Sequence, residues 1–296
     1  NNIIRETGRV LPCGVGVAIF QSAHNRVLHN EISNLLYSGV SVGWTWGYGT
    51  SAAHHNEVAY NHIHHIGWGE LSDMGAVYTL GIQPGTHIHH NVIHDVYSYD
   101  YGGWGLYTDE GSTGIIMENN LVYGCKSGAF HQHYGRDNII RNNIFAFSQY
   151  HQVQLTIAEK HRSFTFTGNI VLADCGDMLR GPWTKANLDM SRNLYWDLRT
   201  AQPAFLKMAF GEWRSQRDKG AVLADPLFVN PQAGNFSLKS RKNVRRVGFV
   251  PFDYTRAGVY GPEEWRAQAK MSDEDIRRFN DIVKGREKAH SRYYDR

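Results

Sequence analysis

Acidic side chains stand beside aromatic ones in the first half of this 296-residue sequence, a combination suited to binding and cleaving sugars. Asp109 and Glu110 follow an apolar run that contains Tyr107, and Asp73 shortly precedes a second such run. Two carboxylates can serve as proton donor and as nucleophile or base when a glycosidic bond is cleaved. We therefore predict that Asp73, Asp109 and Glu110 carry the catalytic chemistry.

A further set of side chains is predicted to hold the substrate. Two acids each lie nine residues beyond a recurring asparagine, so they are expected in neighbouring loops. Aromatic rings can stack on sugar faces, and histidines near the acids can hydrogen-bond to sugar hydroxyls. The predicted substrate-binding residues are Glu70, Asp100, Trp44, Trp104, Tyr107, His131 and His133.

The sequence also contains three His-x-His pairs, which are His62/His64, His87/His89 and His131/His133. Such a pair can bind a metal ion, because alternate residues of a strand point to one face. The three pairs stand at different positions relative to the recurring asparagine, so they are not expected to converge. We therefore predict no metal site and no cofactor. Calcium is the one ion to consider if the substrate is acidic.

The recurring asparagine indicates the framework that positions these side chains. It appears at spacings of 23 to 31 residues, at Asn30, Asn61, Asn91, Asn120, Asn143, Asn169 and Asn193, with Asn2 as an eighth copy. An apolar residue stands three positions before and two positions after each of the seven. We interpret each copy as a strand, a bend at the asparagine and a second strand, since asparagine tolerates the left-handed conformation and stacked amides can form a ladder. The pattern predicts an all-β fold, a right-handed parallel β-helix solenoid.

A third strand is predicted in each of four turns, at residues 39–42, 75–78, 105–108 and 128–131. Alignment of its glycines Gly75, Gly105 and Gly128 predicts an outward row of Thr79, Asp109 and Gln132 and an interior row of Ala76, Leu106 and Ala129. Two turns carry insertions before this strand, at 65–74 and 95–104, and long loops concentrate function. Asp73 lies about six residues out of phase with Asp109. Its loop must therefore curl over the strand for the two acids to meet.

The last part of the chain differs from the repeats. We expect the β-helix of about eight turns to occupy residues 1–240, and a short helical extension at 241–296 to cap or flank the open stack. The chain up to Leu238 has 16 Lys and Arg against 19 Asp and Glu, and the remainder has 15 against 9. A weakly acidic body argues against nucleic acid as the partner, and no apolar run is long enough to span a membrane. Because the pattern is already under way at Asn1, we expect part of the lead-in to be missing.

Several stretches resemble glycoside hydrolase family 141. They are residues 43–47, 72–81, 102–111 and 130–135. The resemblance implies a right-handed β-helix glycosidase like the α-L-fucosidases that act on pectin and the enzymes that act on xylan, with Asp73 and Asp109 as the catalytic pair. Its partner would be an oligo- or polysaccharide of the plant cell wall. That substrate implies an extracellular or periplasmic location.

Two other functions stay open on the sequence. A polysaccharide lyase or epimerase on the same fold would use a basic residue such as Lys126 or Arg136, with calcium to offset the repulsion between an acidic sugar and an acidic cleft. A non-catalytic glycan-binding solenoid would bind sugar without either carboxylate, because function belongs to the site and not to the scaffold.

Overall fold

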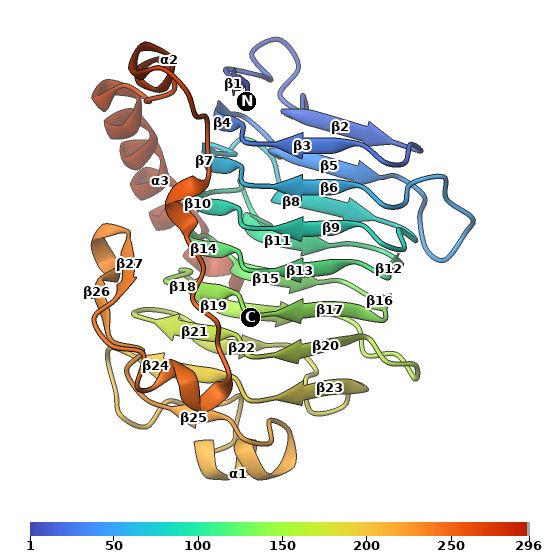
Figure 1. Ribbon diagram of the computed structural model, residues 1–296, viewed down its shortest axis with the longest axis vertical. Helices are drawn as coiled ribbons and strands as arrows, with labels where there is room; N and C mark the ends of the chain where they lie inside the picture. The colour runs from blue at the N-terminus through green and yellow to red at the C-terminus, as the bar shows by residue number, and fades with distance from the viewer. Residues whose placement is uncertain (295–296) are drawn as a thin grey trace.

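The computed structural model is a parallel β-solenoid of about eight turns with helices near its C-terminal end, and it describes residues 1–294 (Figure 1). Three parallel sheets run along the stack, and each of the first seven turns contributes one strand to each of them, while the last two strands belong to sheet A alone. Sheet A consists of β1 (Ile3–Arg5), β4 (Glu31–Leu35), β7 (His62–Ile66), β10 (Val92–Val96), β14 (Leu121–Cys125), β18 (Ile144–Ala146), β21 (Ile170–Ala173), β24 (Leu194–Asp197) and β25 (Val222–Leu223).

The other two large sheets have seven strands each. Sheet B consists of β2 (Val17–Phe20), β5 (Val40–Gly43), β8 (Gly75–Leu80), β11 (Trp104–Thr108), β15 (Gly128–Gln132), β19 (His151–Leu155) and β22 (Asp177–Arg180). Sheet C consists of β3 (Arg26–Leu28), β6 (Glu57–Ala59), β9 (His87–His89), β13 (Ile116–Glu118), β17 (Asn138–Arg141), β20 (Phe164–Thr167) and β23 (Leu188–Ser191).

The remaining elements are short strand pairs and helices. They are the parallel pair β12 (Ser112–Thr113) and β16 (Gly135–Arg136), the hairpin β26 (Phe228–Asn230) and β27 (Asn235–Leu238), and the helices α1 (Phe210–Gln216), α2 (Glu263–Gln268) and α3 (Asp273–Tyr294). Short 3₁₀ turns occur at Pro231–Ala233, Val244–Val247 and Tyr254–Arg256. Among the described residues, no helix combines the length and apolarity needed to cross a membrane.

The predicted asparagine ladder is confirmed. From Asn2 to Asn193, each side-chain amide donates to the Oδ1 of the next asparagine at 2.8–3.1 Å, and the ladder ends on the Oδ2 of Asp218 at 2.9 Å. Each Oδ1 also accepts the backbone N–H of the preceding asparagine in the ladder. The amides therefore link every turn to the next inside the stack, where water cannot replace them.

The bend itself is made by a different residue from the one predicted. The left-handed residue is the one before each asparagine, for example His29 with φ 54° and Asn119 with φ 56°. Asparagine is needed at the next position because its side chain points inward and must reach the neighbouring turn. The two apolar columns that flank the ladder are confirmed as part of the core, which includes Ile32, Ile63 and Met117 at 0% exposure.

The last turn is covered by α1 and not by the C-terminal helices. The Trp213 side chain of α1 is fully buried and stacks on Phe205, which packs on Tyr195 of β24. The C-terminal extension instead runs back along the outside of sheet A toward the first turns (Figure 1). Val250 donates to the Asn142 side chain, and Tyr260 bonds to that of Asn1. Of the two roles predicted for this extension, it flanks the stack.

Candidate active site

The predicted acids lie on the outer face of sheet B, in the turns that contain β8, β11 and β15. Register pairs Tyr107 with Tyr78 and His131, and these three side chains form the outward row. Leu106 is level with Val77 and Phe130 in the core. Thr108, and not Asp109, is level with Thr79 and Gln132, whose side chains are buried. The alignment predicted from the glycines was therefore wrong by one residue in the middle turn.

The physical cause of this shift is a pair of glycines ahead of β11. Gly102 and Gly103 have φ of +105° and +73°, so the chain turns there and the strand begins at Trp104. A Cβ on Gly102 would lie 2.8 Å from the backbone nitrogen of Asp73. The insertions of the two turns are thus packed against each other. Asp73 reaches the site because its loop curls over the strand, as the phase difference required.

Asp109 follows β11 directly and points outward, as predicted. Its Oδ2 accepts the Tyr78 hydroxyl at 2.7 Å, and its Oδ1 lies 2.9 Å from Nδ1 of His133. Burial alone would raise the pKa of Asp109, but the hydrogen bonds from His133, Tyr78 and Tyr107 outweigh it and lower that pKa. The same contact raises the pKa of His133. This contact therefore favours the ionised form of Asp109 and the protonated form of His133.

Asp73 has the opposite electrostatic character. Its backbone N–H donates to the carbonyl of Tyr101, and its Oδ1 accepts the Tyr107 hydroxyl at 3.0 Å. Burial, and next the negative charge of Asp109, raise the pKa of Asp73. The Tyr107 hydroxyl also lies close enough to Asp109 to lower its pKa. The Tyr107 hydroxyl therefore donates to Asp73 and lies near Asp109, and the pKa values of these two carboxylates are shifted in opposite directions.

The other predicted acids do not join this pair. Glu110 accepts the Tyr134 hydroxyl at 2.9 Å. Glu70 is exposed and pairs with Arg286 of α3 at 3.1 Å, so it faces the C-terminal extension. Asp100 serves mainly through its backbone carbonyl, which accepts Nζ of Lys126 at 2.6 Å. The structure thus unites Asp73, Asp109, Tyr107 and His133, while the substrate-binding roles of Glu70 and Asp100 stay predictions.

Several predicted aromatic residues are packed against each other beneath the site. Trp104 and Tyr107 are 3% and 2% exposed, and their ring centroids lie 4.4 Å apart. His131 is 3% exposed, stacks on Tyr107 and packs at a tilt against Trp104. These three rings can support the carboxylates, but in this conformation they offer almost no surface to a sugar. Exposed rings lie next to them: Tyr101, at 43%, packs on Trp104, and Trp46, at 62%, packs on the half-buried Trp44.

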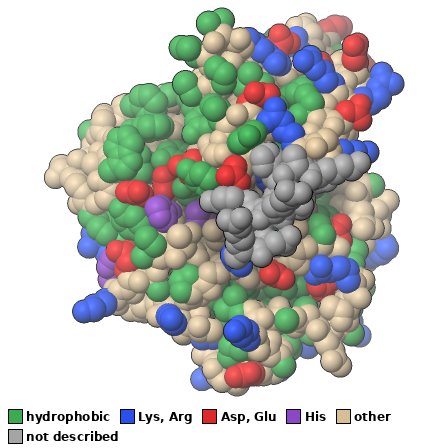
Figure 2. All heavy atoms as spheres, turned by 180° about the vertical axis from the view of Figure 1, so that it is seen from behind, with side chains coloured by type: hydrophobic (Ala, Val, Ile, Leu, Met, Phe, Trp, Pro, Cys, Tyr) green, Lys and Arg blue, Asp and Glu red, His purple; other side chains and the backbone are tan. Residues whose placement is uncertain are grey.

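Figure 2 shows this face of the molecule, with acidic side chains gathered beside histidines and hydrophobic side chains over the middle turns. The sequence reasoning missed Tyr78, the shortest partner of Asp109. That Tyr78 lies beside Tyr107 on the neighbouring strand could have been found only with the correct register, which depends on where β11 begins. Tyr37 was also missed. Its hydroxyl donates to the backbone carbonyl of Asp73 at 3.0 Å and helps to hold that loop.

Lys126, considered above as a base, is engaged elsewhere. Its side chain is fully buried, and Nζ donates to the carbonyls of Ser98, Tyr99 and Asp100 at 2.6–3.0 Å. A lysine with this environment holds the second insertion in shape. Because Nζ is buried and bonded to these carbonyls, Lys126 is poorly placed to act as a base on a sugar carbon.

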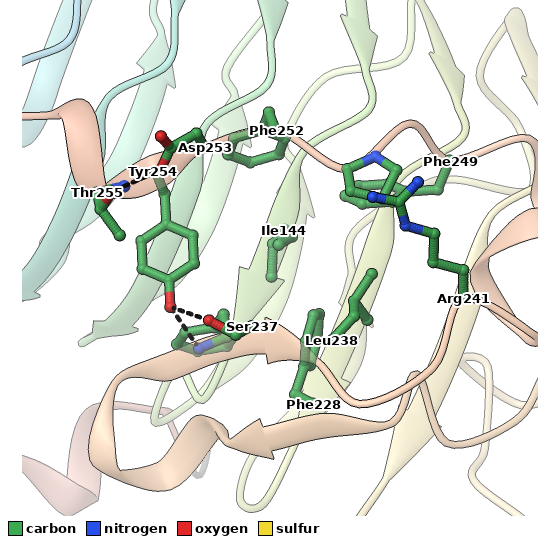
Figure 3. Close-up of a pocket in the computed structure, with 12 residues that line it drawn as sticks. Ile144, Phe228, Ser237, Leu238, Arg241, Phe249, Phe252, Asp253, Tyr254 and Thr255 are labelled. Carbon is green, nitrogen blue, oxygen red and sulfur yellow. Dashed lines mark hydrogen bonds between the residues drawn. The ribbon is translucent and has the colours of Figure 1, made fainter.

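A cavity of about 210 Å³ lies on another side of the molecule, between sheet A and the C-terminal extension (Figure 3). Its lining is mainly apolar, with Ile144 of β18, the hairpin β26–β27 and residues 249–255. The Tyr254 hydroxyl lies 3.3 Å from that of Ser237 at its edge. Asp253 is the one carboxylate among its lining residues, and it caps a turn by accepting from Thr255. The cavity lacks the paired acids that hydrolysis requires.

Comparison with known proteins finds a structural likeness over part of the chain. No protein-family model matches the chain, and no curated protein does. Among solved structures, the chain is similar to a protein described as a glycoside hydrolase, with 33% sequence identity and a TM-score of 0.38. The match covers 40% of this chain and 20% of the other, so this chain spans about a fifth of the length of that protein.

Proposed function

We propose that this protein is a glycoside hydrolase that acts on plant cell-wall polysaccharide, in the manner of an α-L-fucosidase or a xylanase of family 141. The observation that carries the proposal is the pair Asp73 and Asp109, which share the neighbouring Tyr107 hydroxyl and have opposite pKa shifts. Two carboxyl groups whose surroundings separate their pKa values are suited to the roles of acid and base.

The electrostatics assign a role to each acid. Asp73 keeps its proton longer and is the general acid that protonates the leaving-group oxygen. Asp109 stays ionised and is the nucleophile or the base that activates water. Both carboxylates lie near the Tyr107 hydroxyl, which donates to Asp73 at 3.0 Å. A catalytic pair in a glycosidase needs such closeness, because its two carboxyl groups act on one glycosidic bond from about 5–9.5 Å apart.

The substrate class extends the proposal beyond the geometry. Exposed Trp46 and half-buried Trp44 offer ring surface to a sugar beside Asp109. A cell-wall polysaccharide is met outside the cell, so the proposal places the protein in the extracellular space or the periplasm.

Sugar release from a panel of pectic and xylan oligosaccharides tests the proposal. Asp109→Asn and Asp73→Asn are expected to lower kcat by about 10²–10⁴-fold, the range of a lost acid or base. Asp137→Asn is the matched control, because Asp137 is an exposed acid just before β17 of sheet C and pairs with Arg162. Full activity of both site variants would refute the assignment. Sugar binding that persists in both variants, without release by the unmodified protein, would favour the glycan-binding solenoid.

A further inference from the structure

A second cluster of chemically capable side chains lies on the outer face of sheet A, which is not the sheet that carries the two aspartates. It is contributed by the three neighbouring strands β4, β7 and β10, and we call it the histidine cluster. Its members are Glu31, His62, His64, His65, His94 and Asp95. Three facts single it out: its side chains are largely buried, its ring nitrogens face one another, and it contains four histidines within two adjacent turns.

The contacts of the histidine cluster form a closed circuit. Glu31 reaches Nδ1 of His62 at 3.0 Å and Nε2 of His64 at 2.5 Å. From these two rings the circuit continues in both directions, from Nε2 of His62 to Nε2 of His94 at 2.9 Å and from Nδ1 of His64 to Nδ1 of His65 at 2.7 Å. It closes on Asp95, whose Oδ2 lies 2.6 Å from Nδ1 of His94 and 3.8 Å from Nε2 of His65.

Neutral imidazoles supply too few protons for this circuit. Five of its contacts are 3.0 Å or shorter, and each requires one proton between the two atoms. A neutral histidine carries one N–H and an ionised carboxylate carries none, so the six side chains supply four protons. With Glu31 and Asp95 both accepting, the two Nε2 atoms of His62 and His94 face each other with no proton between them. A fifth proton or a cation must compensate.

A metal ion beside Glu31 removes this conflict. His62 then offers the Nδ1 lone pair and His64 the Nε2 lone pair, so the remaining N–H of each ring turns outward. His62 donates to His94, which donates to Asp95, and His64 donates to His65, whose own N–H points toward Asp95. Every ring is neutral, the short contacts His62–His94, His64–His65 and His94–Asp95 each have a proton, and the ion takes the place of the protons between Glu31 and its two rings. Metal-bound histidines commonly donate their second N–H to an outer carboxylate in this way.

We propose that Glu31, His62 and His64 bind one divalent transition-metal ion such as Zn²⁺, with His65, His94 and Asp95 as the outer layer that orients the two ligand rings. The ligand atoms of the three residues lie within 4.8 Å of one another. Ligands bound to zinc at about 2.0–2.1 Å stand roughly 3.3 Å apart in a tetrahedron. The observed separations of 2.5 and 3.0 Å therefore need only a small expansion.

The C-terminal extension covers the proposed site. Gly258 lies against it, since a Cβ there would be 3.1 Å from Oε2 of Glu31 and 3.3 Å from Cβ of His62. Phe279 of α3 packs edge-on against His65 with ring centroids 5.0 Å apart. Glu31 and His64 side chains are each 7% exposed, while His62 is 29% exposed and leaves a route for the ion. Two histidines and one carboxylate leave coordination positions for water.

Metal binding is tested on the tag-free full chain, stripped with chelator and titrated with ZnCl₂ by calorimetry. Elemental analysis after desalting counts the bound zinc, and Co²⁺ provides a visible absorption band as an independent readout. We expect one Zn²⁺ per chain. Glu31→Gln and His64→Asn should abolish stoichiometric retention, and Asp95→Asn should weaken binding by about 10–100-fold, the usual effect of an outer partner.

His87→Asn is the matched control, because His87 and His89 are also a His-x-His pair with acid partners, at 2.9 and 3.2 Å, on sheet C. It should bind zinc as the unmodified protein does. Circular dichroism establishes that each variant is folded. No retained zinc in the folded, unmodified protein would overturn the proposal and leave a fifth proton as the compensating charge. Zinc binding that survives Glu31→Gln and His64→Asn but is lost in His54→Asn would overturn it in favour of the more exposed group His24, His54 and His55.

Discussion

Removal of one amide from the asparagine ladder is the sharpest test of how this solenoid is held together. Asn91 is fully buried and makes four side-chain hydrogen bonds. Its Oδ1 accepts the backbone N–H and the amide of Asn61, both at 3.0 Å, and its Nδ2 donates to Val58 and Asn120 at 2.9 and 3.0 Å. Asn91→Ala removes all four and leaves buried donors and acceptors without partners.

The expected loss follows from these contacts. A hydrogen bond contributes about 1 kcal/mol net, and a buried polar group without a partner costs about 1–3 kcal/mol. Allowing for partial relaxation, we expect Asn91→Ala to lower the free energy of unfolding by about 3–4 kcal/mol. Asn2 is the matched control, because it stands exposed at the end of the same ladder with one side-chain bond to Asn30. Asn2→Ala should cost less than about 1 kcal/mol.

Urea unfolding followed by circular dichroism and by tryptophan fluorescence measures both values. Coincident transitions from the two probes establish that a single free energy describes the unfolding. A loss in Asn91→Ala no greater than in Asn2→Ala would show that the ladder is not a main source of stability. The apolar columns alone would then account for the cohesion between turns.

Three further perturbations test other parts of the structure. Tyr78→Phe removes a hydrogen bond to ionised Asp109 and so raises the pKa of Asp109. The acid limb of the profile of kcat/KM against pH should therefore move to higher pH. Movement of the alkaline limb alone would contradict the assigned roles. Burial lowers the pKa of His151 to about 4, so the unfolded chain takes up this proton first as the pH falls below about 6.5. Stability is therefore lost as the pH falls from about 6.5 to 4. His151→Gln should reduce the slope of the free energy of unfolding against pH, measured in urea between pH 7 and 4, by up to about 1.4 kcal/mol per pH unit. An unchanged slope would refute burial as the cause. Gly258→Ala should speed proteolysis of the C-terminal extension more than Gly248→Ala, because both glycines are left-handed but only at Gly258 would a Cβ press on its neighbours, 3.1 Å from Oε2 of Glu31. Equal rates would show that backbone strain alone matters.

The periodic part of the fold was predictable from the sequence because it repeats a local rule. Each turn needs one inward asparagine and apolar residues at fixed distances from it. The same pattern therefore recurs seven times along the sequence and can be recognised there. The residue that makes the bend was not recognised, because the asparagine next to it is the one that recurs. Residues as different as His29, Asn119 and Gly168 take the left-handed position, and no residue type marks it.

The candidate site was predictable in its residue types but not in its register. The motif around Asp109 indicated an outward acid. Which residues lie next to Asp109, here His133 and Tyr78, depends on whether β11 begins at Trp104 or at Gly105. A shift of one residue reverses the face of every side chain in a strand. That start point is decided by the turn at Gly102 and Gly103, which is packed against the loop of Asp73.

The sequence by itself determined the solenoid, the location of its insertions and the acids they carry, because these follow from spacing along one chain. Only the tertiary structure decided which side chains meet. In the folded chain, the loop of Asp73 lies over β11, and Trp104 and Tyr107 are buried beneath the carboxylates. Glu31 lies beside His62 and His64. The asparagine contacts between turns join residues 23 to 31 positions apart. Contacts between turns depend on strand register and on which segment covers each sheet, and spacing along the sequence does not encode either with enough precision.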